Sequence, residues 1–295
     1  MAYTDTSLGT FSGRTITGQE LDSIKETVAL FGNLSRTELT HTICEHLDWR
    51  TPSGSNKWDA CSKMLMSFEK KGWLSLPEKL QKKKTSPPVI HFSKNTDPGT
   101  PTEKTLHELG TVQLVRAKTR NEIKLWNEYL DRYHYLGYKR PFGYRLKYFI
   151  RAQGTLLGCI LFSGAARALT CRDKWIGWTT TQRQNNLPYI INNSRFLIFP
   201  WVKVKNLASH VLGKAADRAA KDWKKNWGFT PALMETFVDP EHYKGTCYTA
   251  ANWTYIGMTT GKGLVRKGKT YSTQPKKIFV RHIDKNFRGR LCADV

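Results

Sequence analysis

The sequence has no apolar run of the roughly 18 residues that a membrane-spanning helix needs, so we expect no membrane anchor. Its first ten residues, MAYTDTSLGT, lack the basic start and apolar core of a secretory signal. The six cysteines form no Cys-x-x-Cys pair and show no Cys–His zinc spacing, which predicts reduced thiols without a disulfide framework or a structural zinc. These absences favour a cytoplasmic protein, and no metal site is expected.

Acidic residues are scarce in only one part of the chain. The 295 residues carry 47 Lys and Arg against 24 Asp and Glu, a net charge of +23. Residues 1–110 hold 14 basic and 13 acidic side chains, whereas residues 111–295 hold 33 and 11. Nucleic acid is the usual partner of so cationic a surface, because phosphate contacts release counterions. An anionic membrane is the weaker alternative, since no basic amphipathic helix stands out.

The first 80 residues contain three predicted helices, because apolar residues recur there at helical spacing. The predicted helices are 17–31, 35–46 and 56–71, followed by a strand-like run at 73–76. Ser35 and Glu38 form a capping-box pattern before the second helix. The pattern predicts an all-α, winged-helix-like DNA-binding domain over 1–80, whose third helix directs Lys57 and Lys63 toward the major groove. The near-neutral charge also suits a small bundle that docks a protein partner.

The rest of the chain divides into a linker and a larger domain. Residues 81–110 are rich in Lys, Pro, Thr and Ser without a sustained period, which is typical of a linker. Strands and helices then alternate over 111–295, which predicts an α/β domain. The predicted strands are 112–116, 144–152, 155–163, 195–201, 232–238, 253–257 and 277–283, and the predicted helices are 119–134, 206–227 and 246–252.

Several runs of this larger domain resemble the DruA family, a component of the Druantia anti-phage system that also occurs beside insertion-sequence transposases or fused to them. The matching runs are YHYLGY (133–138), DKWIGW (173–178), NNSRFLIFPWVKVKNLASHVLG (192–213), ETFVDPEHYKGTCYTAANWTYIG (235–257) and KKIFVRHIDKNFRGRLC (276–292). The resemblance implies a DNA-processing protein of bacterial antiviral defence or of mobile elements. It also implies a helicase or transposase subunit as a partner.

Segment 235–257 is similar in addition to Mom-type DNA modification proteins, which share its strand, Asp, Gly-Thr, Tyr and Asn-Trp. Those proteins have the fold of GNAT acyltransferases, so the resemblance implies a GNAT-like mixed central sheet flanked by helices. Acetyl-CoA binders of that fold hold the pyrophosphate on a glycine-rich turn. The corresponding turn here, VKVKNLASHV (202–211), has no glycine. Ordinary use of acetyl-CoA is therefore not expected, and the cofactor stays unknown.

Two carboxylates of this segment are candidate catalytic groups. Glu235 and Asp239 lie on one face of a regular strand, about 13 Å apart along the chain. This distance is too long for a two-metal nuclease or a glycosidase pair. One of them is therefore predicted to be a general base, and Glu235→Gln is expected to abolish activity but not DNA binding. The alternatives are a loop-capping Asp239 and a Glu235 paired with an arginine.

Three further side chains are candidates for catalysis. Gly245 opens a short helix whose dipole would lower the pKa of Cys247 and make it a nucleophile. Tyr248 would donate a proton or attack a phosphodiester, and it is the stronger candidate because the Mom-like segment shares it. A buried, inert thiol is the alternative for Cys247. His134, at a predicted helix end, is either catalytic or structural.

The remaining candidates would contact DNA. Arginines clamp phosphates well because their guanidinium groups bind two oxygens at once. Asn252 and Trp253 would hold a flipped base, although a Trp buried in the core is an equal alternative. The predicted phosphate contacts are Arg145, Arg183 and Arg195, with Lys262, Arg266 and Lys267 in a basic tail.

Three functions are consistent with these features. The first is a DNA-acting enzyme that modifies a base, with a carboxylate deprotonating a base amine that attacks an activated carbonyl. The second is a transposase-like or nuclease-like enzyme that cleaves or transfers strands, with Tyr248 or Cys247 as the nucleophile. The third is a non-catalytic DNA-recognition subunit for a helicase or transposase. The expected partner is duplex DNA, with single-stranded DNA as an alternative.

Overall fold

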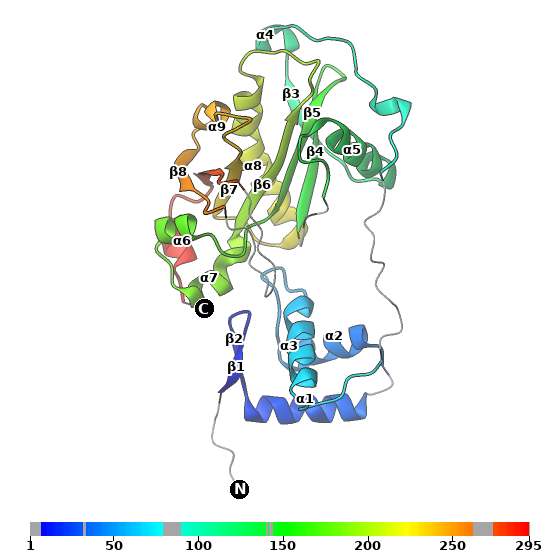
Figure 1. Ribbon diagram of the computed structural model, residues 1–295, viewed down its shortest axis with the longest axis vertical. Coiled ribbons are helices and arrows are strands. Elements are labelled where there is room, and N and C mark those ends of the chain that lie inside the picture. Colours follow the sequence, from blue (N-terminus) through cyan, green and yellow to red (C-terminus); the bar gives the residue numbers. More distant parts are fainter. Residues whose placement is uncertain are drawn as a thin grey trace. The chain divides into compact units, whose positions relative to one another are not determined.

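The computed structural model describes residues 7–31, 34–78, 90–139, 141, 144–261 and 274–294 (Figure 1). The chain divides into two compact units, Met1–Pro88 and Val89–Val295. No helix in the described ranges is long and apolar enough to cross a membrane.

The first unit contains three helices preceded by a β-hairpin. Its elements are β1 (Ser7–Phe11), β2 (Arg14–Thr17), α1 (Gly18–Leu30), α2 (Arg36–His46) and α3 (Trp58–Lys70). The three predicted helices are thus present, and the predicted capping box of Ser35 and Glu38 opens α2. Buried side chains from all three helices form the core, among them Ile24, Leu39 and Phe68.

The expectation of an all-α unit with a strand at 73–76 was wrong. No strand is present at 73–76; instead, β1 and β2 pair before α1. The run after α3 is held by side chains: Leu76 donates its N–H to Glu69 and the carbonyl of Pro77 accepts from Arg36. The ring of Trp73 packs 5.3 Å from that of Phe68. Such contacts fix an extended chain without a partner strand, and a local pattern does not reveal them.

The predicted linker of 81–110 extends too far, because much of it packs on the larger unit. Ser93 donates two hydrogen bonds to the buried carboxylate of Glu128, and Tyr129 donates one to the carbonyl of Asn95. Thr102 forms a parallel bridge with Val202. The segment includes η1 (Lys94–Thr96) and α4 (Leu106–Leu109). Its partners are distant in sequence, so composition alone suggested a linker.

A seven-stranded mixed sheet forms the larger unit (Figure 1). Its strands are β3 (Val112–Arg116), β4 (Arg145–Ala152), β5 (Thr155–Gly164), β6 (Ile190–Ile198), β7 (Leu233–Val238), β8 (Thr254–Met258) and β9 (Lys277–His282). The strand order is β3-β4-β5-β6-β7-β9-β8, and only β6 and β7 pair in parallel. The expected mixed α/β domain with a central sheet flanked by helices is confirmed.

Helices cover both faces of this sheet. They are α5 (Arg120–Tyr133), α6 (Thr170–Ile176), α7 (Thr180–Asn186), η2 (Leu187–Tyr189), α8 (Leu207–Trp227), α9 (Thr246–Thr249) and α10 (Phe287–Leu291). Adjacent residues of β4 identify the faces, because neighbouring side chains of a strand point to opposite sides. Lys147 donates to Asn127 of α5, whereas Tyr148 donates to Asp222 of α8. Helices α5 and α8 therefore lie on opposite faces.

The parallel pair β6–β7 separates before either strand ends. The pairing runs from Ile190 and Leu233 to Asn193 and Thr236 and stops there. The register of β6 against β5 shifts at the same place, which makes a bulge at Ser194. Bulges re-aim side chains and are frequent beside functional sites. The ends of β6 and β7 beyond this point place the side chains described next.

Candidate functional site

Glu235, the first predicted general base, is a buried ion-pair partner. Its side chain and that of Arg172 are both 0% exposed, and Arg172 Nη1 donates to Glu235 Oε2 over 2.7 Å. The other carboxylate oxygen accepts the N–H of Ala166 at 2.7 Å. A base enclosed in this way has no route to a substrate proton. The alternative, an arginine partner, is the one present, and it comes from α6, a helix that the sequence did not predict.

Tyr248 does not meet the needs of a surface nucleophile. It is buried, and its hydroxyl donates to Asn193 Oδ1 over 2.8 Å and lies 3.3 Å from Thr236 Oγ1. Burial raises the pKa of this phenol. Asn193 and Thr236 are the last residues at which β6 and β7 pair with each other. Tyr248 therefore stabilises the point where the two strands separate.

Cys247 is half-buried, and the predicted thiolate is not favoured. Burial raises the pKa of the thiol, and the backbone N–H of Tyr248 lowers it by less. The backbone N–H groups of α9 thus lower the pKa of Cys247 as expected, but the helix has only four residues and the loss of solvent raises that pKa by more. The alternative of an inert thiol agrees with this environment.

Trp253 cannot stack on a base, because it is 3% exposed and its ring meets Tyr248 edge to face at 5.2 Å. The core alternative for this residue is therefore the correct one. Asn252 is exposed in a turn with φ of 60°. Its exposure is compatible with a ligand contact but does not supply one.

The predicted phosphate contacts are divided among several environments. Arg183 donates to Asp173 at 3.1 Å, and Arg145, the first residue of β4, is half-buried. In the first unit, Lys57 donates to the carbonyl of Ser12, whereas Lys63 is exposed on α3. The tail residues Lys262, Arg266 and Lys267 lie outside the described residues.

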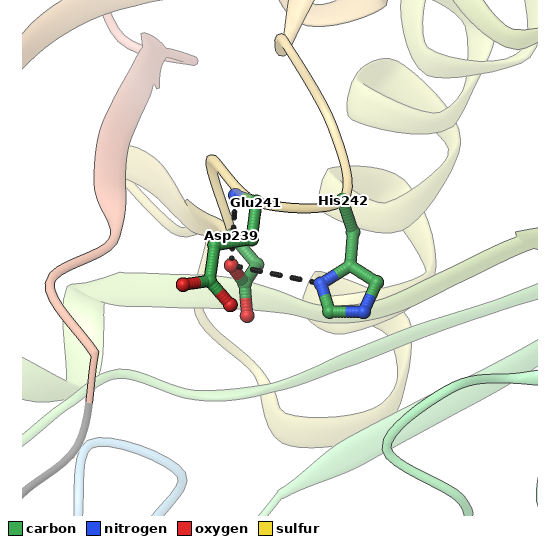
Figure 2. A group of neighbouring side chains, drawn as sticks. All are labelled: Asp239, Glu241 and His242. Atoms are coloured by element: carbon green, nitrogen blue, oxygen red, sulfur yellow. Dashed lines mark hydrogen bonds and ion pairs between the residues drawn. The ribbon is translucent and has the colours of Figure 1, made fainter.

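Asp239, the second predicted general base, stands at the end of β7 in a polar turn. Its side chain is 10% exposed and that of His242 is 50% exposed. The carboxylate lies 3.8 Å from His242 Nδ1 and 4.0 Å from Lys276 Nζ, and it accepts the N–H of Glu241 at 3.2 Å. Figure 2 shows the side chains of Asp239, Glu241 and His242 gathered on one side of this turn. An imidazole beside a shielded carboxylate is an arrangement suited to acid–base catalysis.

A stack of rings adjoins this turn. The ring of Tyr135 stacks on those of His134 and His242, with 4.9 and 4.8 Å between centroids and 24° and 26° between ring planes. Tyr243 lies 5.7 Å from Tyr135. Lys276 Nζ stands 5.9 Å from the centroid of Tyr135. The stack joins the end of α5 to the turn after β7, two segments far apart in the sequence.

His134 is a neutral imidazole in this stack. Burial, with the nearby charges of Arg195 and Lys276, lowers its pKa to about 4. Its Nδ1 accepts the N–H of Leu136 at 3.2 Å, so the remaining ring proton is on Nε2. Arg195 is fixed beside it through donations to the carbonyls of Gly137 and Ser194, at 3.2 and 2.6 Å. His134 and Arg195 are therefore positioned side chains, and neither resembles a freely solvated group.

The structure thus brings together three of the predicted residues, Asp239, His134 and Arg195, and leaves Glu235 and Trp253 out of the site. The prediction missed Tyr135, His242 and Lys276. His242 follows Asp239 by three residues within the Pro-Glu-His turn, which was a usable signal. Tyr135 and Lys276 join the site only through folding, so no local pattern indicates them.

The turn could also hold a cation. One ligand atom from each of Asp239, Glu241 and His242 lies within 4.8 Å of the others. Carboxylate oxygens with an imidazole nitrogen suit several divalent metals. Lys276, 4.0 Å from the carboxylate of Asp239, opposes a second positive charge at this place.

The turn before α8 is held in part by Thr102. Lys203 donates its N–H to the carbonyl of Thr102 at 2.9 Å, and Val202 donates to Phe199 at 2.9 Å. Thr102 in turn donates to the carbonyl of Trp201 at 2.8 Å. Thr102 thus pairs with both sides of this turn, and the expectation about acetyl-CoA, drawn from the missing glycines, stays a prediction.

The larger unit is thus a cationic α/β domain, and its polar, aromatic-lined candidate site lies where two parallel strands separate. The family is more specific. The family model described as Druantia protein DruA matches residues 67–282, so the chain belongs to the DruA family. A comparison with curated proteins finds no match.

Solved structures that are similar to this chain include several acetyltransferases. The aminoglycoside acetyltransferase AAC(6')-Ib with coenzyme A and kanamycin is 16% identical, with 61% of this chain and 98% of that one covered and a TM-score of 0.40. An acetyltransferase of Bacillus subtilis with CoA is 10% identical, with 58% and 97% covered and a TM-score of 0.34. RimL, a ribosomal L7/L12 alpha-N-protein acetyltransferase, is 13% identical, with 48% of this chain and 64% of that one covered and a TM-score of 0.30. The chain therefore spans less than two thirds of that RimL chain, and these identities are too low to transfer a substrate or cofactor.

Proposed function

We propose that this DruA-family chain is a DNA-processing enzyme whose larger unit carries out acid–base chemistry on a DNA base. One observation carries the proposal: the shielded carboxylate of Asp239 faces the half-exposed imidazole of His242, 3.8 Å away, beside a stack of aromatic rings. The distance is longer than a hydrogen bond, and catalytic contacts of free enzymes often shorten when substrate binds.

The chemistry assigned to the pair is proton transfer. His242 removes a proton from the base amine as its nitrogen attacks the carbonyl carbon of an activated acyl donor, and Asp239 stabilises the imidazolium that forms. The new N–C bond forms as the bond from the carbonyl carbon to the donor's leaving group breaks, and the imidazolium returns its proton to that leaving group. Lys276 and Arg195 supply positive charge near the developing negative charge or a neighbouring phosphate. His134 stays neutral through its lowered pKa and orients Tyr135 by stacking.

DNA as the substrate is supported by charge and by family. Residues 111–295 hold three times as many basic as acidic side chains, 33 against 11. The DruA family match supports a place in phage defence, where the DNA to be processed enters the cytoplasm. We further propose that the first unit holds duplex DNA with α3, on which Lys63 is exposed, and that a helicase or transposase subunit acts with the chain.

Metal-dependent strand cleavage is the second candidate function. It is favoured by the three ligand atoms of Asp239, Glu241 and His242 within 4.8 Å. A metal-bound water, rather than the buried Tyr248, would then be the nucleophile. The two functions differ in their product: a new nucleoside or a broken strand.

The test is incubation of the purified chain with duplex and single-stranded DNA in a bacterial extract depleted of nucleic acid, followed by nucleoside mass spectrometry and denaturing gels. We expect a new nucleoside mass, and its formation should fall by roughly 100-fold or more in Asp239→Asn and in His242→Gln. Both variants should keep their DNA affinity, since neither removes a positive charge fixed at the site. Glu103→Gln, an exposed carboxylate variant elsewhere in the unit, is the control and should behave as wild type.

The other outcomes are distinct. Broken strands that need a divalent metal, and that disappear in Glu241→Gln as well as in Asp239→Asn, would replace base chemistry by cleavage. Tight DNA binding without any product would contradict both enzymatic functions and leave a recognition subunit.

A further inference from the structure

The ring stack beside the site ends at the protein surface. Tyr243 is 55% exposed, Tyr135 is 38% exposed and the side chain of His242 is 50% exposed. The neighbouring Leu136 is 38% exposed. We call Tyr135, His242 and Tyr243 the aromatic platform. Soluble proteins rarely leave several apolar rings exposed in one place, so such a group is typical of a binding surface.

The packing around the platform holds the ring of Tyr135 and the backbone that carries His242 and Tyr243. Tyr135 is fixed between the imidazoles of His134 and His242 at 4.9 and 4.8 Å. Tyr243 follows in the same turn, which is closed by the donation of its N–H to the carbonyl of Asp239 at 2.9 Å. Rings that are already ordered lose little conformational freedom when a ligand stacks on them.

Positive side chains adjoin the platform. Lys276 Nζ lies 5.9 Å from the ring centroid of Tyr135, and the exposed Lys244 directly follows Tyr243. Lys277 reaches the same turn, where its Nζ donates to the carbonyl of Lys244 at 3.2 Å. A planar aromatic surface bordered by lysines complements one ligand chemistry in particular, a base with the phosphates on either side of it.

We propose that the aromatic platform receives one unpaired base of single-stranded or locally opened DNA, which stacks on the exposed ring of Tyr243 and presents its edge to the imidazole of His242. The inference rests on the proposed function and specifies its substrate as an unstacked nucleotide. A base in this position lies beside the carboxylate of Asp239 and the imidazole of His242, which are the groups assigned to proton transfer. The platform, rather than the buried Trp253, is then the place that holds a flipped base.

The experiment measures stacking and affinity together. The probe is a thymidine single strand of about 12 nucleotides with one central 2-aminopurine, whose fluorescence falls when the base stacks on a ring. Binding is followed for the full chain and for Tyr243→Ala, Tyr243→Phe and Tyr255→Ala. Tyr255, on edge strand β8, is the matched control because it is 50% exposed and lies outside the platform.

We expect the wild type and Tyr243→Phe to quench the probe on binding. Tyr243→Ala should quench it less and bind roughly 5- to 150-fold more weakly, the range for one lost base–aromatic stack. The slope of affinity against salt should not change in this variant, since no phosphate contact is removed. Tyr255→Ala should match the wild type.

Two results would overturn the proposal, and they differ in what else they affect. If Tyr243→Ala binds and quenches like the wild type, the platform holds no base, whereas the proposed function stands. If the wild type binds neither single-stranded nor duplex DNA at low salt, the proposed function fails and the platform loses its ligand with it.

Discussion

At the scale of single residues, the same side-chain type has opposite uses in β7 and in the turn that follows it. The carboxylate of Glu235 is enclosed by Arg172 and the N–H of Ala166, whereas that of Asp239 faces a half-exposed imidazole. A buried charge needs a fixed partner, so Glu235 holds α6 against β7. A carboxylate that supports proton transfer needs a partner that can reach a substrate, and of the two only Asp239 has one, the half-exposed His242.

Glu235→Gln should therefore destabilise the larger unit rather than remove a catalytic base. We expect a loss of about 3 kcal/mol in the free energy of unfolding, because the change leaves Arg172 buried without its closest counter-charge. The loss stays at the lower end of the usual range since Asp173 also accepts from Arg172, at 2.8 Å. Urea unfolding followed by circular dichroism measures it, with Glu103→Gln as the control. An unchanged stability together with a lost activity would restore Glu235 as a catalytic group.

His134 should make the stability of the chain depend on pH in the acidic range. Its folded pKa is about 4, below the unfolded value of about 6.5, so the unfolded state binds the proton more readily. The stabilising contribution is therefore complete above about pH 6.5 and is lost as the pH falls toward 4, by up to about 3 kcal/mol. His134→Asn keeps an acceptor for the N–H of Leu136 but does not titrate.

The measurement for His134 is the unfolding free energy of both proteins between pH 4 and pH 7. The difference between wild type and His134→Asn should shift steadily against the wild type as the pH falls. A difference that stays constant over this range would show that the imidazole is not held neutral by its surroundings.

At the scale of elements, the sequence predicts what local signals encode. Capping residues and helical spacing indicate α1, α2, α5 and α8, and alternating or buried apolar runs indicate all seven strands of the main sheet, with boundaries displaced by a few residues. Helices α6 and α7 and the hairpin β1–β2 were not predicted. Helix α6 is only seven residues long and has no side-chain cap at its N-terminus, so it carries little local signal.

The site was predictable only in part for the same reason. Asp239 was identified because it ends a strand, and His134 because it ends a helix. Their shared environment depends on how β6 and β7 separate and on where the end of α5 lies, and both are set by tertiary packing. The burial of Glu235, Tyr248 and Trp253 likewise follows from α6 and α9 closing over the sheet, which no pattern within β7 reveals.

At the scale of the whole molecule, charge and fold divide the chain in the same place. Unit Met1–Pro88 holds 12 basic and 10 acidic side chains, whereas Val89–Val295 holds 35 and 14. Each unit has a hydrophobic core of its own. The units are therefore expected to fold separately, and the electrostatic part of DNA binding should belong almost wholly to the larger one.

Separate fragments 1–88 and 89–295 test this division. Each should unfold cooperatively by itself, and fragment 89–295 should keep nearly the full dependence of duplex affinity on salt, since the slope reports the number of phosphates neutralised. Fragment 1–88 should bind weakly with a shallow slope, because its net charge is close to zero and any contact it makes must be with a few bases. Fluorescence anisotropy of a labelled duplex between 50 and 200 mM salt, a range over which such slopes are well resolved, measures both. A slope that is steep in fragment 1–88 and shallow in fragment 89–295 would refute the assignment, because the surplus of positive charge in the larger unit would then have a partner other than DNA.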